Sequence, residues 1–302
     1  MEIFKKGFSK FIGKIFRSRY TFVFVNGFLL ASILYFYSED NYEKKLFESL
    51  ASYVKNKSRG TANYQEALLL NSLHVTYSLC ENRSAIFGNK GIHSFKSSVI
   101  HPVTYDLMTS DGACGSYSYV LSRLLNELKI PNRIAQMKVN GFYGGHILVE
   151  AKAANDWVVM DGSYNLYFKK PNGVIASFND VQRNWSFYRN QLPANYNLNY
   201  NYGGVRYTNW EKVPVMMPVI RKILSLAIGK EKANKFSFRT YILRKFHILF
   251  ELTIYIHLLL LIIFIRNYLR RSSNRAIRYF SILFSRKRSL LIVMAESKSK
   301  CA

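Results

Sequence analysis

The sequence contains little cysteine and little acidic charge. Its 302 residues include three cysteines, Cys80, Cys114 and Cys301, and 18 Asp and Glu against 43 Lys and Arg. Three cysteines are too few for a disulfide framework, and their spacing does not match that of metal ligands. There is no collagen period, heptad run or other internal repeat, and an apolar fraction of 49% excludes a disordered chain. The sequence therefore indicates a folded protein with one sizeable core.

Residues 21–37 form the first of two long apolar segments. They contain no charged side chain, and as a helix these 17 residues would measure about 25 Å, near the lower limit for crossing a bilayer. Lys and Arg are frequent in residues 1–20, whereas Glu39, Asp40 and Glu43 follow the segment. This asymmetry predicts a cytoplasmic N-terminus. A cleavable signal peptide has the same layout, but no small-x-small cleavage site follows, so we predict an uncleaved anchor.

Residues 246–265 form the second apolar segment, which contains three ionisable side chains, His247, Glu251 and His257. His247 and Glu251 are four residues apart, so on a helix they could satisfy one another. The alternative, which we favour, is that both reach water or lipid headgroups near the membrane surface. The length and apolar character of the segment predict a second span.

The first span usually sets the orientation, and a long domain crosses the membrane regardless of its charge. Two spans would therefore place both termini, including the basic tail 266–302, in the cytoplasm. Residues 38–212 are the predicted folded domain outside the membrane. Residues 213–245 are basic and amphipathic, and we expect them to lie on the membrane surface and to attract anionic headgroups. No nucleic-acid-binding motif is present, so we assign the net charge of +25 to the membrane and not to nucleic acid.

The stretch from residue 110 to residue 131, SDGACGSYSYVLSRLLNELKIP, predicts a helix that is buried on one face. Ser110 or Asp111 can cap its N-terminus, and Pro131 disfavours helical geometry at the residue before it. Apolar side chains recur at the spacing of a buried helix face. They are Tyr117, Val120, Leu121, Leu124, Leu125 and Leu128.

Cys114 lies at the start of this predicted helix, one turn before Tyr117. A helix N-terminus stabilises a thiolate, and Gly112 and Gly115 leave the backbone around the cysteine uncrowded. These features favour a nucleophile. A lone cysteine on a helix is also commonly a small buried hydrophobic residue, so its position alone does not decide. For Cys80 we expect that buried role and not a disulfide with Cys114.

Beyond Pro131 the pattern changes to β-strands. The strands are predicted at residues 133–139, 146–150 and 157–161. A glycine-rich turn is predicted at 141–145, and a hairpin joins the last two strands. An even-length hairpin loop puts His146 and Asp161 on the same face of the sheet, either directly opposite or diagonal to one another. An odd-length loop would put them on opposite faces.

A nucleophile, a base and a carboxylate that orients the base form the general arrangement for acyl transfer. Here His146 would withdraw the proton of Cys114 and later protonate the leaving amine, while Asp161 would fix the tautomer of the imidazole. Both partners also have a structural interpretation, His146 as a satisfied strand histidine and Asp161 as a turn residue before Gly162. Their occurrence in this order favours the catalytic interpretation.

Residues 109–168 resemble the core of the transglutaminase-like superfamily of papain-type α+β proteins. The matching stretches are DGACGSYSYVLSRLLNELKIPNRI, GGHILVE and DWVVMDGSYN. The resemblance implies an α+β fold in which a helix carrying the cysteine packs on an antiparallel sheet. It also implies that Cys114 is the nucleophile, His146 the base and Asp161 the orienting acid, with no cofactor.

Three features depart from the superfamily pattern. Lys129 stands where glycine is usual, in the turn before Arg133, which matches a recurrent basic residue. Gly162 replaces the common proline after the aspartate. The Trp or Gln side chain that completes the oxyanion hole in relatives has no counterpart that we can locate upstream, although the backbone N–H of Cys114 could supply one donor.

Residues 190–210, NQLPANYNLNYNYGGVRYTNW, are rich in Tyr and Asn. Such a segment could be a flap that contacts the substrate, because Tyr and Asn offer stacking and hydrogen bonds to a glycan or peptide. The alternative is an ordinary surface loop with aromatic side chains that plug the core, and we favour this second interpretation.

Together these features predict a membrane-anchored cysteine enzyme that acts on amide or peptide bonds through a thioester on Cys114. Water as acceptor would make it a peptidase or amidase and an amine would make it a transglutaminase; analogy with the superfamily favours hydrolysis of a peptide or protein amide, with the cell envelope as a candidate source. The second hypothesis is a catalytically silent binding module of a cell-envelope assembly. A transporter is disfavoured because only two spans exist. His74, His93 and His101 lack metal-ligand spacing, so no metal is expected.

Overall fold

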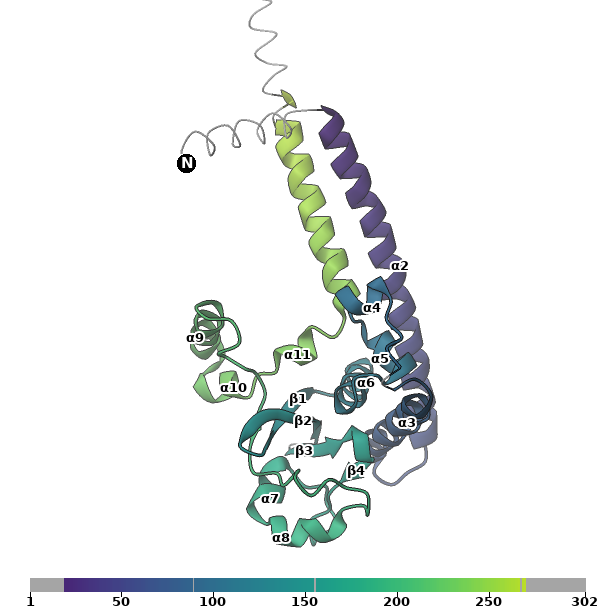
Figure 1. Ribbon diagram of the computed structural model, residues 1–302, viewed down its shortest axis with the longest axis vertical. Coiled ribbons are helices and arrows are strands. Elements are labelled where there is room, and N and C mark those ends of the chain that lie inside the picture. Colours follow the sequence, from purple (N-terminus) through teal and green to yellow (C-terminus); the bar gives the residue numbers. More distant parts are fainter. Residues whose placement is uncertain (1–18, 89, 155, 267, 270–302) are drawn as a thin grey trace, which may run out of the picture. The chain divides into compact units, whose positions relative to one another are not determined.

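The computed structural model describes residues 19–88, 90–154, 156–266 and 268–269 (Figure 1). Nearly all of the predicted cytoplasmic tails, and with them Cys301, lie outside the described residues. The chain divides into two compact units. One consists of the residues up to Phe36 and those from Leu249 onwards, and the other consists of Tyr37–Ile248.

The first unit contains both apolar segments as helices. Helix α2 spans Arg19–Ser58, and a second helix spans Lys245–Arg266; each is long and apolar enough to cross a membrane. Phe22 and Phe264 stack on one another with ring centroids 3.8 Å apart, so the two helices pack together here. Only 6% of the most apolar window of either helix is buried within the protein. Their apolar side chains therefore face outward, which differs from the core helix of a water-soluble domain.

Helix α2 continues without interruption from the first apolar segment into the second unit. Residues 39–56 belong to the same element as the first apolar segment, because no Pro or Gly interrupts the chain between Gly27 and Ser58. Phe47, Ala51 and Val54 of α2 are buried in the core of the second unit. The element that carries the first apolar segment thus also contributes to the folded domain.

Four further helices precede the sheet. They are α3 (Tyr64–Phe87), α4 (Phe95–Val99), α5 (Val103–Thr109) and α6 (Cys114–Glu127). The predicted buried face is confirmed, since the five predicted apolar side chains of α6 and Leu128, directly after the helix, all lie in the core. α3 packs against both α5 and α6. The face of α6 that carries apolar side chains three and four residues apart therefore packs against the sheet and against the helices α3 and α5.

The sheet has five antiparallel strands in the order β4-β3-β2-β1-β5. The strands are β1 (Asn132–Val139), β2 (Phe142–Ala153), β3 (Asp156–Asp161), β4 (Leu166–Tyr167) and β5 (Val205–Arg206). Adjacent residues of one strand pack into different cores: Ile134 faces the helices α2, α3 and α6, whereas Ala135 faces the opposite side. The molecule is therefore an α+β protein, as the sequence predicted, with its sheet buried on both faces.

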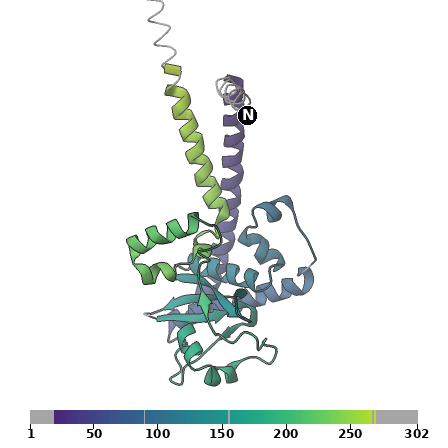
Figure 2. The same cartoon turned by 60° about the vertical axis from the view of Figure 1, so that its left-hand side comes forward.

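The opposite face of the sheet is covered by short helices and by the Tyr-rich segment. The helices are α7 (Phe178–Arg183) and α8 (Trp185–Tyr188), with the 3-10 turn η2 (Arg189–Gln191). Another 3-10 turn, η1 (Gly162–Tyr164), contacts α3 and α6. Figures 1 and 2 show α7 and α8 on the side of the sheet away from α6. Phe168, Phe178 and Tyr202 form this second core. Residues 213–245 follow as α9 (Met216–Ile228), α10 (Lys230–Asn234) and α11 (Phe238–Tyr241).

The register of the β2–β3 hairpin sets the position of the predicted base and acid. Val149 lies opposite Met160 and Ala153 lies opposite Asp156. Asp161 is therefore diagonal to His146 on the same face of the sheet, which is one of the two arrangements expected for an even-length loop.

The turn predicted at residues 141–145 is shorter than expected. β2 already begins at Phe142, and Gly144 and Gly145 lie within it at a register irregularity beside Lys138. A Cβ atom on Gly145 would come within 2.7 Å of Cβ of Val139, so glycine is needed there for close packing and not for a turn.

Candidate active site

Cys114 is the first residue of α6, but the N-terminus of this helix differs from the prediction. The residue before the helix is Ala113, at φ 45°, and not Ser110 or Asp111. Ser110 instead ends α5 in a left-handed conformation, at φ 52°. Because α5 ends at Thr109, the chain must reverse within four residues before α6 can begin, and this reversal uses the positions that we expected to cap the helix.

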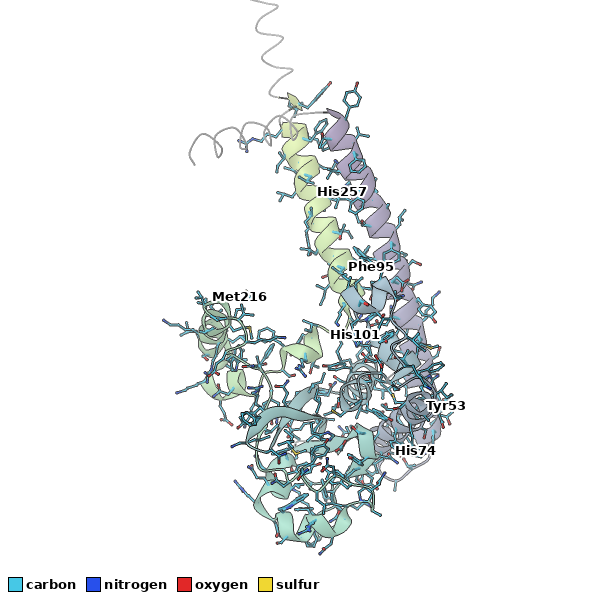
Figure 3. The ribbon with its side chains drawn as sticks, viewed as in Figure 1. Tyr53, His74, Phe95, His101, Met216 and His257 are labelled. Atoms are coloured by element: carbon cyan, nitrogen blue, oxygen red, sulfur yellow. The ribbon has the colours of Figure 1, made fainter. Side chains whose placement is uncertain are left out.

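Asp106 of α5 fixes this reversal. Its Oδ1 accepts a hydrogen bond of 2.6 Å from Oγ of Ser116, which in turn accepts one of 2.9 Å from the backbone N–H of Gly112. A Cβ atom on Gly112 would lie 2.8 Å from Oγ of Ser116, so the turn requires glycine. His101, labelled in Figure 3, places Nε2 3.2 Å from the same oxygen of Asp106. This chain of hydrogen bonds fixes the backbone on both sides of Cys114.

Our interpretation of the sequence missed Asp106 and Ser116. The signal available in the sequence was that these polar residues stand on helices with otherwise apolar faces. In the structure both are buried: Ser116 fully, and Asp106 with 1% of its surface exposed. Buried polar groups are normally hydrogen-bonded, which indicates that such residues pair, but the identity of the partner requires the tertiary structure.

His146 and Asp161 are in direct contact. Nε2 of His146 lies 2.7 Å from Oδ2 of Asp161, and the two side chains are 1% and 0% exposed. The other oxygen of Asp161 accepts a hydrogen bond of 3.1 Å from the backbone N–H of Ser163 and caps η1. Both carboxylate oxygens are therefore used, which fixes the side chain and through it the imidazole.

The imidazole of His146 also interacts with Cys114. Asp161 occupies Nε2, and Nδ1 is buried without a hydrogen-bond partner among the described residues, so Nδ1 is the ring nitrogen that remains for the thiol. Burial acts to lower the pKa of His146, but the charge and hydrogen bond of Asp161, together with the thiol, raise this pKa to about 9. Burial likewise acts to raise the pKa of Cys114, but the hydrogen bond and charge of His146 outweigh it and lower this pKa. Both shifts favour a thiolate–imidazolium pair.

Two tyrosines lie against the imidazole of His146, and a third packs against these two. Tyr200 stacks on His146 with ring centroids 4.1 Å apart and an interplanar angle of 13°, while Tyr164 lies 6.1 Å away. Tyr196 packs 4.5 Å from Tyr164. Burial and then the charge of Cys114 raise the pKa of Tyr200. Tyr196 and Tyr200 both come from residues 190–210, and the structure thus places the segment that we expected as a flap or loop against the candidate base.

The backbone N–H of Cys114 is a candidate donor for an oxyanion. Within the described part of the chain it donates no hydrogen bond, whereas the next two amides, of Gly115 and Ser116, bond back to Gly112 and Ala113. A free N–H at a helix N-terminus is suited to an oxyanion.

The other candidates from the sequence lie elsewhere. Cys80 is a free thiol buried inside α3, as expected for a buried residue, and burial raises its pKa to about 11. Arg133 donates a hydrogen bond of 2.6 Å to Glu150 and lies over the ring of Trp157, a structural role. His74 and His93 pair with other polar groups: His74 with Asn165, and His93 with a tyrosine hydroxyl.

Comparison of the chain with protein-family models, with curated proteins and with solved structures finds no match. The assignment of a function therefore depends on the geometry of the site itself.

Proposed function

We propose that this chain is a membrane-anchored cysteine enzyme of transglutaminase-like type, with Cys114 as nucleophile, His146 as general base and acid, and Asp161 as the group that orients His146. The observation that carries the proposal is the buried 2.7 Å contact between His146 and Asp161, together with the electrostatic interaction of His146 with Cys114 that lowers the pKa of the thiol. A nucleophile, a base and an orienting acid within interaction distance form the general arrangement for acyl transfer.

In the first step, the Cys114 thiolate attacks the carbonyl carbon of an amide, and the backbone N–H of Cys114 stabilises the resulting oxyanion. The imidazolium of His146 donates its Nδ1 proton to the leaving nitrogen as the C–N bond breaks. The products are a thioester on Cys114 and a free amine. The raised pKa of His146 supports this role, since an imidazolium is the acid that the leaving amine requires.

In the second step, water attacks the thioester while Nδ1 of His146 accepts its proton. The C–S bond breaks, a carboxylic acid leaves and the thiolate–imidazolium pair is restored. An amine in place of water would give a new amide and a transglutaminase reaction. We propose hydrolysis of a peptide or protein amide, on the analogy with the superfamily that the sequence resembles.

The two apolar helices support the membrane part of the proposal. Their outward-facing apolar side chains, such as Phe24 and Leu34 on α2 and Leu259 and Ile262 on the second helix, are at least half exposed. Exposure of apolar surface over two whole helices is costly in water and is favourable in lipid. The basic residues before the first span favour a cytoplasmic N-terminus.

One observation favours the second candidate function, a silent binding module of a cell-envelope assembly. The ring of Tyr200 covers the imidazole, and His146 is only 1% exposed, so the site is closed to a bulky substrate in this conformation. A Cys114→Ser variant that retains the biological role of the protein would favour the module. Loss of that role would favour the enzyme.

The direct test is the rate at which iodoacetamide alkylates Cys114, measured as a function of pH on the full chain by mass spectrometry. The thiol of Cys80 serves as an internal control, because burial raises its pKa. We expect rapid alkylation of Cys114 well below the free-thiol pKa of about 8.5, and a loss of this reactivity in His146→Ala. A rate that follows an ordinary thiol, or that is unchanged in the variant, would contradict the proposed catalytic pair.

A further inference from the structure

A second site lies apart from the cysteine, in the segment that follows β5. Here α9, Lys230 at the start of α10 and the chain around Arg206 and Thr208–Glu211 line an open cavity of about 940 Å³. The side chains used below are those of Arg206, Trp210, Arg221, Lys222 and Lys230, all of which line the cavity. Its size is sufficient for a small polar molecule or the headgroup of a lipid.

The charge of this cavity is strongly positive. Four cations line it, Arg206, Arg221, Lys222 and Lys230, whereas Glu211 is the one carboxylate among its lining residues in the described chain. A concave surface of one charge sign concentrates counter-ions of the opposite sign. The cavity is therefore suited to an anion.

Neutral partners hold the two arginines in place. Arg206 donates a hydrogen bond of 3.0 Å to Oε1 of Gln136, and Arg221 donates one of 2.8 Å to Oδ1 of Asn234. Their guanidinium groups are thus positioned without being neutralised. A neighbouring cavity differs, since its cations pair with carboxylates, Arg133 with Glu150 and Lys170 with Asp180. Positioned but unneutralised arginines are typical of phosphate-binding sites.

The apolar face of α9 indicates the source of the anion. Met216, Val219, Ile223 and Leu226 follow the spacing of one helix face and are 53%, 52%, 60% and 81% exposed; Met216 is labelled in Figure 3. The cavity is lined from another face of the same helix, by Pro218, Arg221, Lys222 and Ser225. A helix with an apolar face beside a cationic face is typical of segments that lie in the membrane interface.

We propose that this cavity binds the phosphate of an anionic membrane lipid while α9 lies in the interface with its apolar face toward the acyl chains. In that position the cations of the cavity lie at the level of the headgroups, where each contributes favourably to binding of anionic lipid. The indole of Trp210, over which Arg221 lies at 6.0 Å, also suits the interface, because its ring is apolar and its N–H is polar. The proposal does not depend on chemistry at Cys114.

The test uses the full chain in detergent. It is incubated with dioleoylphosphatidylglycerol, dioleoylphosphatidylcholine or inorganic phosphate, and retained molecules are measured by native mass spectrometry. Wild type is compared with the double variant Lys222→Gln, Lys230→Gln and with a matched control, Lys212→Gln, Lys232→Gln, which removes two exposed lysines that do not line the cavity. Circular dichroism confirms that each variant is folded.

We expect wild type and the control pair to retain phosphatidylglycerol in preference to phosphatidylcholine, and the cavity variant to lose at least fivefold of this preference. A further variant, Val219→Asn with Leu226→Asn, should also weaken retention of the lipid, because it removes the apolar face. An equal loss in the control pair, or no loss in the cavity variant, would overturn the proposal. Inorganic phosphate could instead bind tightly, compete with the lipid and be unaffected by the apolar-face variant. That result would make the cavity a site for free phosphate and would also overturn the proposal.

Discussion

At the residue scale, Asp161 combines the two interpretations that the sequence left open. One oxygen bonds His146 and the other caps η1 through the backbone N–H of Ser163. The turn residue and the partner of the imidazole are therefore the same side chain. Because a fully buried carboxylate is costly unless its oxygens are paired, the turn helps to keep the charge that the imidazole needs.

The charge of Asp161 can be tested separately from its shape. In Asp161→Asn the side chain can still cap η1, but it no longer stabilises the imidazolium of His146. We expect the pKa of Cys114 to rise and its alkylation at pH 7 to slow about tenfold, equivalent to one pKa unit. The pH profile of iodoacetamide labelling measures this. Asp156→Asn, at the exposed start of the same strand, should leave the profile unchanged; a similar shift in both variants would contradict the role of Asp161.

At the element scale, both ends of α6 are defined by backbone conformations that favour glycine but are occupied by other residues. Ala113 before the helix has φ 45°, and Lys129 after it has φ 61°. At the C-terminus the N–H of Ile130 bonds to the C=O of Leu125 and that of Lys129 to Asn126, which is a Schellman motif. This explains why glycine would be the favoured residue at position 129.

Glycine at this position should stabilise the fold. Lys129→Gly relieves the steric cost of the left-handed conformation, which exceeds the entropy that glycine adds to the unfolded chain. We expect an increase of about 0.5–1 kcal/mol in the free energy of unfolding of the full chain, measured by denaturant titration in detergent. Lys152→Gly, within β2, is the matched control and should be destabilising. A decrease for Lys129→Gly would contradict the strain that we infer.

The Tyr-rich segment is the second element whose role depends on the structure. Tyr200 covers the imidazole of His146, while Leu198 of the same segment is 59% exposed. In Tyr200→Ala we expect a bulky maleimide to label Cys114 several-fold faster, because the site opens, with little change for small iodoacetamide. Leu198→Ala should have no effect on either reagent. Equal rates for the bulky reagent in wild type and Tyr200→Ala would show that the segment does not control access.

At the scale of the whole molecule, α2 connects the first apolar segment with the helix that carries the cysteine. The guanidinium of Arg123 on α6 is 1% exposed, lies 3.3 Å from Oε1 of Glu43 and 4.9 Å from the ring centroid of Phe47, both on α2, and also pairs with Glu127. A buried ion pair contributes specificity when it is complete and is strongly destabilising when one partner is removed. The position of α6, and with it Cys114, therefore depends on α2.

Removal of this arginine should destabilise the domain. In Arg123→Ala the buried carboxylate of Glu43 loses its partner, so we expect a loss of about 3–5 kcal/mol in unfolding free energy, measured by denaturant titration with protease sensitivity as a second readout. Adding Glu43→Leu in the same chain should recover much of this loss, because the unpaired charge is gone. Arg183→Ala, on an exposed side chain of α7, is the control. No recovery in the double variant would indicate that packing and not charge accounts for the effect.

Local patterns in the sequence were enough to predict the two apolar helices, the buried face of α6, the strands β1, β2 and β3 and, for an even-length hairpin loop, the placement of His146 and Asp161 on one face of the sheet; they did not predict the short strands β4 and β5. Each of these depends on a period of 3.6 or 2 residues, or on a run of apolar side chains, which neighbouring residues determine by themselves. The α+β class was instead expected from the resemblance of residues 109–168 to a known superfamily.

Contacts between distant residues decided the rest. The start of α6 at Cys114 depends on the hydrogen bonds that join Asp106, Ser116 and Gly112, and the cover over His146 depends on Tyr200, 54 positions further along the chain. Gly145 likewise lies in a strand because Val139 packs against it. No local period encodes such pairings, since each becomes favourable only after the chain has brought both partners together and removed them from water.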